Sequence, residues 1–168
     1  MASWASLIPA LLVVAPFSGA AIAAECVQSK AIYQDRGKVY EIRFSPATSE
    51  AAATSHTFTL KLLKGGMVMD GVVLPADGSQ RANGLLMYKC PDGDVTGADL
   101  AKCTVWDGVF YGIAADGAVV DLPEASANAA EQLILSDFSR QAQNSPVWAD
   151  KKIADIPADV LTLEGCGS

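Results

Sequence analysis

The 168-residue sequence contains a single histidine, His56, and none of the short patterns that mark common catalytic sites. It has no GxSxG nucleophile elbow, no HExxH zinc pair, no P-loop and no GxGxxG dinucleotide loop. His56 is in line with Phe58 and Leu60 at the start of an expected strand, so we interpret it as a strand-edge residue and not as a general base. The sequence therefore favours a non-enzymatic role, although it does not decide the question.

Positive charge is also scarce. The chain has 12 Lys and Arg against 19 Asp and Glu, which gives a formal net charge of −7 at pH 7. Because nucleic-acid recognition depends largely on Lys and Arg meeting phosphates, this balance argues against a nucleic-acid partner. The excess of acid is typical of a protein kept soluble by its charge, and a partner with a basic surface is the alternative.

Long apolar runs are absent after residue 24. Residues 1–24 carry no charged side chain, and within them residues 7–17 (LIPALLVVAPF) form an apolar run followed by small residues. The run is shorter than the roughly 20 residues that a helix needs to cross a bilayer, so it predicts a secretory signal peptide. We expect a signal peptide over 1–23, a single globular domain over 24–168 with no integral membrane segment, and a periplasmic or secreted location.

The four cysteines, Cys26, Cys90, Cys103 and Cys166, contain no CxxC pair, which indicates neither a zinc ribbon nor a thioredoxin-type redox centre. An even number of cysteines in an exported chain predicts two disulfides. Three pairings are possible. We favour Cys90 with Cys103, which closes a local loop, and Cys26 with Cys166, which joins the two ends of the chain. No metal and no cofactor is expected.

The acidic loop between Cys90 and Cys103 partly matches a calcium-binding EF-hand. Asp92, Asp94 and Thr96 fit ligand positions 1, 3 and 5, but Cys103 stands at position 12, where a bidentate glutamate is needed. The alternative is a turn followed by a short helix in which Thr96 and Asp99 form a capping box. We favour this structural interpretation, and a weak calcium site stays open.

Alternating apolar and polar residues dominate the chain between 38 and 122. Residues 38–44 and 55–64 each place apolar side chains on one face of a strand, and further strands are expected at 67–74, 84–90, 104–114 and 118–122. Glycine-rich turns at 65–66, 76–79 and 116–117 separate them. The pattern predicts an antiparallel sheet of five to seven strands.

Residues 124–143 show a helical period instead. Apolar residues recur at Ala127, Ala130, Leu133, Ile134, Phe138 and Ala142. We therefore expect one long amphipathic helix there, packed on a face of the sheet, and a last short strand at 160–163 that carries Cys166 back to the N-terminal edge. The predicted fold class is α+β.

Two groups of residues are candidates for function. Trp106, Phe110 and Tyr111 are possible ligand contacts, since aromatic side chains on a strand can form a binding platform, although strand aromatics more often fill a core. Asp70 and Asp107 are possible partners in a carboxylate pair of the glycosidase type. Both precede glycine, and we interpret the Asp-Gly steps as β-bulges.

Taken together, the residues indicate a small exported, disulfide-bonded domain that binds a protein or small ligand without catalysis. A small hydrolase or lyase with a carboxylate site is the first alternative. A structural component of the cell envelope is the second. The discriminating features are an exposed binding patch, a concave pocket with converging carboxylates, or neither.

Overall fold

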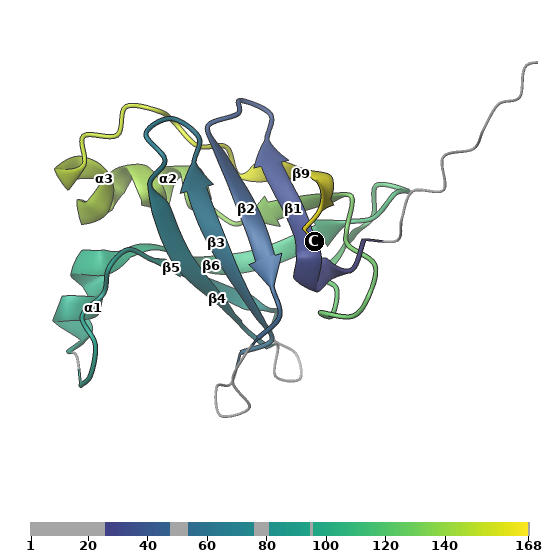
Figure 1. Ribbon diagram of the computed structural model, residues 1–168, viewed down its shortest axis with the longest axis horizontal. Helices are drawn as coiled ribbons and strands as arrows, with labels where there is room; N and C mark the ends of the chain where they lie inside the picture. Colours follow the sequence, from purple (N-terminus) through teal and green to yellow (C-terminus); the bar gives the residue numbers. More distant parts are fainter. Residues whose placement is uncertain (1–25, 48–53, 76–80, 95, 168) are drawn as a thin grey trace, which may run out of the picture.

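The protein folds into a closed antiparallel β-barrel. The computed structural model describes residues 26–47, 54–75, 81–94 and 96–167; the predicted signal peptide and the predicted turn at 76–79 lie outside these ranges. The strands are β1 Ala31–Asp35, β2 Tyr40–Ser45, β3 His56–Leu62, β4 Val68–Leu74, β5 Asn83–Met87, β6 Thr104–Ile113, β7 Val119–Asp121, β8 Gln132–Leu135 and β9 Val160–Cys166. Neighbouring strands are antiparallel in the order β1-β2-β3-β4-β5-β6-β8-β9, and β9 pairs with β1 to close the ring (Figure 1).

Short helices and one extra strand, β7, complete the barrel. The helices are a 3-10 helix at Gln28–Lys30, α1 Gly97–Cys103, α2 Phe138–Asn144 and α3 Pro146–Asp150. All three α-helices lie at the same end of the barrel (Figure 1). β7 pairs with β6 beyond the point where β5 begins, so it extends the barrel wall without being needed for closure.

The predicted α+β class is wrong, because the described residues form nine strands in a closed barrel instead of a sheet of five to seven, and the long helix at 124–143 does not form. Residues 132–135 form β8 between β6 and β9, and only Phe138–Asn144 are helical. Leu133 and Leu135 are fully buried at a spacing of two residues, which is the period of a strand. Without β8 the barrel would have two open edges, so long-range backbone pairing outweighs the helical spacing of apolar residues in this segment.

Several local predictions are confirmed. Gly65 and Gly66 both have positive φ, 81° and 68°, in the turn between β3 and β4, and the last strand pairs Cys166 with Ala31 of β1. The bulge interpretation of the Asp-Gly steps is wrong. Gly71 lies in regular register with Phe58 and Leu86. The register shifts instead fall between Ile32 and Tyr33 and between Leu86 and Met87.

Aromatic side chains fill the barrel interior. Tyr33, Tyr40, Phe44, Phe58, Trp106 and Phe110 are each at most 5% exposed. Their rings meet mostly edge to face, as for Trp106 and Phe110, whose centroids are 5.1 Å apart. Gly71 and Gly84 make room for these rings, because a Cβ on Gly71 would collide with the Phe58 ring and one on Gly84 with Phe110 and Trp106. The lumen is therefore a packed core.

Each end of the barrel is covered by a different segment. At the helical end, Phe138 of α2 packs against Tyr40 and Trp106, with ring centroids 5.2 and 6.1 Å away. At the opposite end, the Tyr33 hydroxyl lies 2.9 Å from both Gln28 Oε1 and the carbonyl oxygen of Ala130. These contacts join the 3-10 helix and the segment before β8 to the core.

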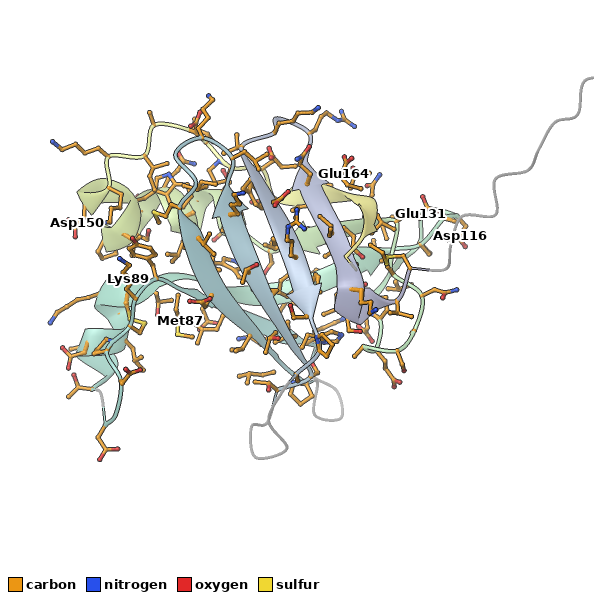
Figure 2. The ribbon with its side chains drawn as sticks, viewed as in Figure 1. Met87, Lys89, Asp116, Glu131, Asp150 and Glu164 are labelled. Carbon is orange, nitrogen blue, oxygen red and sulfur yellow. A yellow bond between two sulfur atoms is a disulfide. The ribbon has the colours of Figure 1, made fainter. Side chains whose placement is uncertain are left out.

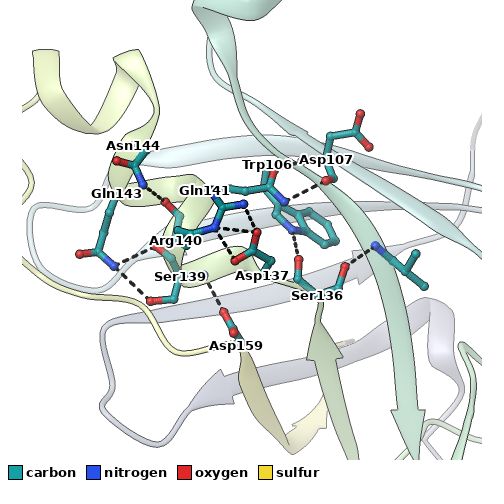
Figure 3. Close-up of polar contacts among 11 residues, drawn as sticks. Trp106, Asp107, Ser136, Asp137, Ser139, Arg140, Gln141, Gln143, Asn144 and Asp159 are labelled. Carbon is teal, nitrogen blue, oxygen red and sulfur yellow. Dashed lines mark hydrogen bonds and ion pairs between the residues drawn. The ribbon is translucent and has the colours of Figure 1, made fainter.

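Helix α2 also covers an edge of β6 that no strand of the described residues reaches. The side chain of Gln141 donates to the carbonyl oxygen of Asp107 and accepts from the Asp107 N–H, both at 3.1 Å, while Ser136 Oγ accepts from the Val109 N–H at 2.8 Å (Figure 3). One side-chain amide thus replaces the backbone of a missing neighbouring strand. The backbone groups of Asp107 and the N–H of Val109 therefore have hydrogen-bond partners without a further strand.

We expect Gln141→Ala to lower the free energy of unfolding by about 1–2 kcal/mol, because two hydrogen bonds to a strand edge are lost. Urea unfolding measures the change. Gln143→Ala is the matched control, since Gln143 bonds only to Ser139 within α2, and its effect should stay within about 0.5 kcal/mol. Equal effects for the two variants would contradict the role assigned to Gln141.

Candidate binding site

Two disulfides are present in the structure, as the cysteine count predicted. Cys26 is joined to Cys166, with Cα atoms 5.5 Å apart, and Cys90 to Cys103, with Cα atoms 5.3 Å apart. The first bond ties the two ends of the chain beside the seam between β1 and β9. The second holds the loop after β5 against the end of α1, at the helical end of the barrel.

The aromatic residues singled out in the sequence do not form a surface platform together. Trp106 and Phe110 are fully buried in the lumen, and Trp106 Nε1 donates to the carbonyl oxygen of Ser136 at 2.8 Å. Tyr111 points to the other side of β6, where its ring lies 5.3 Å from the guanidinium of Arg81. Of the three residues, Tyr111 alone is in a position to contact a ligand outside the barrel.

The two aspartates considered as a carboxylate pair both lie on the outer face, on β4 and β6, which β5 separates. Asp70 is in register with Met87 of β5, whereas Asp107 is in register with Leu85 of the same strand. Asp107 also accepts a hydrogen bond from Asn83 Nδ2 at 2.7 Å. The structure does not bring Asp70 and Asp107 together on one row of the sheet.

A pocket that the sequence analysis missed lies beside the Cys90–Cys103 loop. It has a volume of about 350 Å³, at the lower end of the range usual for small-ligand sites. Its lining comes from the end of β5, α1 and α3: Tyr88, Lys89, Pro91, Asp99, Lys102, Cys103, Val147, Asp150 and Lys151. We call it the lysine pocket. Figure 2 shows Lys89 and Asp150 at this end of the molecule.

The lysine pocket is positive although the whole chain is acidic. Its lining holds three lysines and two aspartates, a net charge of +1, against −7 for the chain. Lys102 is engaged with Asp99, Nζ to Oδ1 3.1 Å. Lys89 and Lys151 have no carboxylate partner within 4.0 Å among the described residues, and their ammonium groups lie 5.4 and 5.5 Å from the centre of the Tyr88 ring.

Local structure fixes the parts of the pocket. The Tyr88 N–H donates to the carbonyl oxygen of Cys103 at 2.9 Å, next to the disulfide. Lys89 adopts the left-handed backbone region, with φ of 49°, which turns the chain out of β5. α3 begins at a Ser145 cap that accepts from the Trp148 N–H, and Trp148 is buried. Lys151 is the residue that directly follows α3.

The acidic loop forms the helix cap that the sequence predicted. Thr96 Oγ1 accepts from the Asp99 N–H at 3.2 Å, and its hydroxyl donates to Asp99 Oδ2 at 2.7 Å. Hydrogen bonds from the side chains of Thr96 and Lys102 lower the pKa of Asp99 below its usual value. Within the described residues no three His, Cys, Asp or Glu side chains are arranged to hold a metal ion.

A second pocket of about 350 Å³ lies at the opposite end of the barrel, where β3 begins. It includes His56, which is 3% exposed, together with Ser55, Asp121 and Glu124. His56 Nδ1 lies 3.0 Å from Ser55 Oγ, and its Nε2 has no well-aligned hydrogen bond within the described residues. Asp121 pairs with Arg81. His56 faces inward and packs edge-on against Phe44, at 5.8 Å between ring centres.

Burial lowers the pKa of His56 below 6.5, and the backbone carbonyl of Pro123 opposes part of the shift. The unfolded chain therefore binds a proton at a higher pH than the folded protein, and stability is fully present above about pH 6.5 and falls as the pH drops below it. We expect His56→Phe to weaken this loss, because the phenyl ring takes up no proton when the chain unfolds. Urea unfolding at pH 5 to 8 measures it, and equal slopes for the two proteins would contradict it.

Comparisons with protein-family models, with curated proteins and with solved structures found no match. Among the described residues, no helix combines the length and the apolar character needed to cross a membrane.

Proposed function

We propose that the protein is an exported, non-enzymatic binding module that recognises its partner with the outer surface of the barrel, at the end that carries the lysine pocket. The observation that carries the proposal is the filled lumen. Six aromatic side chains from four strands occupy the interior, so there is no room for an apolar ligand of the kind that barrel carriers enclose.

Two further features support this function over the alternatives. Disulfides form and persist in oxidising compartments, which fits a periplasmic or secreted location. The separated positions of Asp70 and Asp107 offer little support for a hydrolase or lyase built on that pair. A purely structural envelope component would not require a charged pocket, held by a disulfide, on an otherwise acidic chain.

Site-specific photo-crosslinking tests the proposal. A photoreactive amino acid replaces Lys102, an exposed lining residue of the lysine pocket, and in a second protein replaces Asp116, an exposed residue at the opposite end of the barrel (Figure 2). Each oxidised protein is irradiated in the native exported fraction. We expect a discrete adduct from position 102 and none from position 116. Equal, diffuse labelling from both positions, or none from either, would contradict the proposal.

A further inference from the structure

Two ammonium groups that form no ion pair within the described part of the chain lie near one aromatic ring in the lysine pocket. Lys89 and Lys151 come from different parts of the chain, after β5 and after α3, and both lie within 5.5 Å of the centre of the Tyr88 ring. Each ammonium is therefore at most about 11 Å from the other, which is the sum of the two distances. A negative charge bound in this pocket would be attracted by both ammonium groups.

The other lining residues indicate what kind of chemical group would carry the negative charge. Val147, which is 5% exposed, and Pro91 also line the pocket, so the lining that holds the Tyr88 ring provides further apolar surface. Tyr88 is only partly buried. An apolar stem can therefore pack on Tyr88 while its charged end meets Lys89 and Lys151, as aromatic rings and cations combine in many ligand sites.

One lining side chain, the carboxylate of Asp150, would repel a bound anion. Asp150 lines the same pocket and has no ion pair with a described Lys or Arg. Lys102, in contrast, is held by Asp99 and contributes little net charge. Two free lysines against one free aspartate leave the pocket positive by one, and Lys152, adjacent in the chain and exposed, adds to the field.

We propose that the lysine pocket binds an anionic group, a carboxylate or a phosphate, carried on an apolar stem that packs on Tyr88, with Lys89 and Lys151 as the recognising charges. The inference rests on the proposed function, since the anion is the feature of the partner that this end of the barrel recognises. It also explains why unpaired lysines gather here in a chain with an excess of acid.

The test is a titration of the ¹⁵N-labelled, oxidised protein with phenyl phosphate and, separately, with phenylacetate, at constant ionic strength. Benzyl alcohol supplies the stem without the charge. We expect saturable amide shifts around Tyr88, Lys102 and Lys151 with at least one anion, and the stronger of the two identifies the anion. No saturable shift, or equal shifts with benzyl alcohol, would overturn the proposal.

Charge variants sharpen the result. Lys89→Gln with Lys151→Gln should weaken anion binding about tenfold or more, which is about 1.4 kcal/mol, and Asp150→Asn should tighten it severalfold. Lys30→Gln with Lys61→Gln, two exposed lysines outside the pocket, should leave affinity unchanged; an equal loss in both double variants would overturn the assignment. Anion binding without a crosslinked partner would contradict the proposed function alone, and a crosslinked partner without anion binding would contradict this inference alone.

Discussion

Replacing Cys26 and Cys166 with serine is expected to lower the free energy of unfolding by about 5 kcal/mol, on the chain-entropy account of disulfides. The bond closes a loop with a sequence separation of 140 residues, the largest that this chain can form between cysteines. It also lies beside the β1–β9 seam, where Ala31 pairs with Cys166. A loss of this size is comparable with the whole stability of many domains of this length.

The second disulfide is the internal control. Cys90→Ser with Cys103→Ser opens a loop with a sequence separation of only 13 residues, so the same account gives a loss of about 3 kcal/mol. Urea unfolding of the two double variants, with far-ultraviolet circular dichroism to check the fold, measures both. A larger loss for the short loop than for the long one would contradict the idea that the terminal bond secures the closing seam.

Gly71→Ala is expected to lower the free energy of unfolding by about 1–3 kcal/mol, although it adds only a methyl group. A Cβ at this position would collide with three atoms of the Phe58 ring, which is held in place by Phe44 and Phe110. The ring has no free space to move into because the lumen is packed. Overpacking therefore costs stability even for the smallest side chain.

A matched substitution and a compensating one test this explanation. Gly165→Ala on β9 meets nothing within 4 Å, so its effect should stay within about 0.5 kcal/mol. Phe58→Leu should make Gly71→Ala less damaging in a double-mutant cycle, since the smaller side chain frees the volume that the new methyl group needs. Additive effects of Gly71→Ala and Phe58→Leu would show that the two residues do not compete for the same space.

The strands were predictable because their information is local. Alternation in 38–44 and 55–64 identifies the inward face of β2 and β3, and positive-φ glycines identify the turn that follows β3. The closure was not predictable in this way. β8 has only four residues, too few for its two-residue period to outweigh the helical spacing around it, and its partners Phe110–Ile113 and Val160–Thr162 are distant in the sequence.

The lysine pocket could not be predicted from the sequence for a similar reason. Tyr88, Lys102 and Lys151 are far apart in the sequence, and each alone is typical of a solvated surface. They meet because the Cys90–Cys103 bond holds the loop after β5 against α1, while α1 contacts α3. Trp106 and Phe110 were conspicuous in the sequence, but with Gly108 between them they occupy inward positions of β6 and serve the core.

The most direct test of the central claim, a filled barrel that binds with its outside, is a titration of the oxidised protein with oleate, followed by the methyl NMR signals of inward-facing Leu60, Val73 and Leu133. All three side chains are fully buried. We expect these signals not to shift at any oleate concentration below aggregation. Saturable shifts with one-to-one stoichiometry at the three methyl groups would contradict it and would identify the protein as a carrier of apolar ligands.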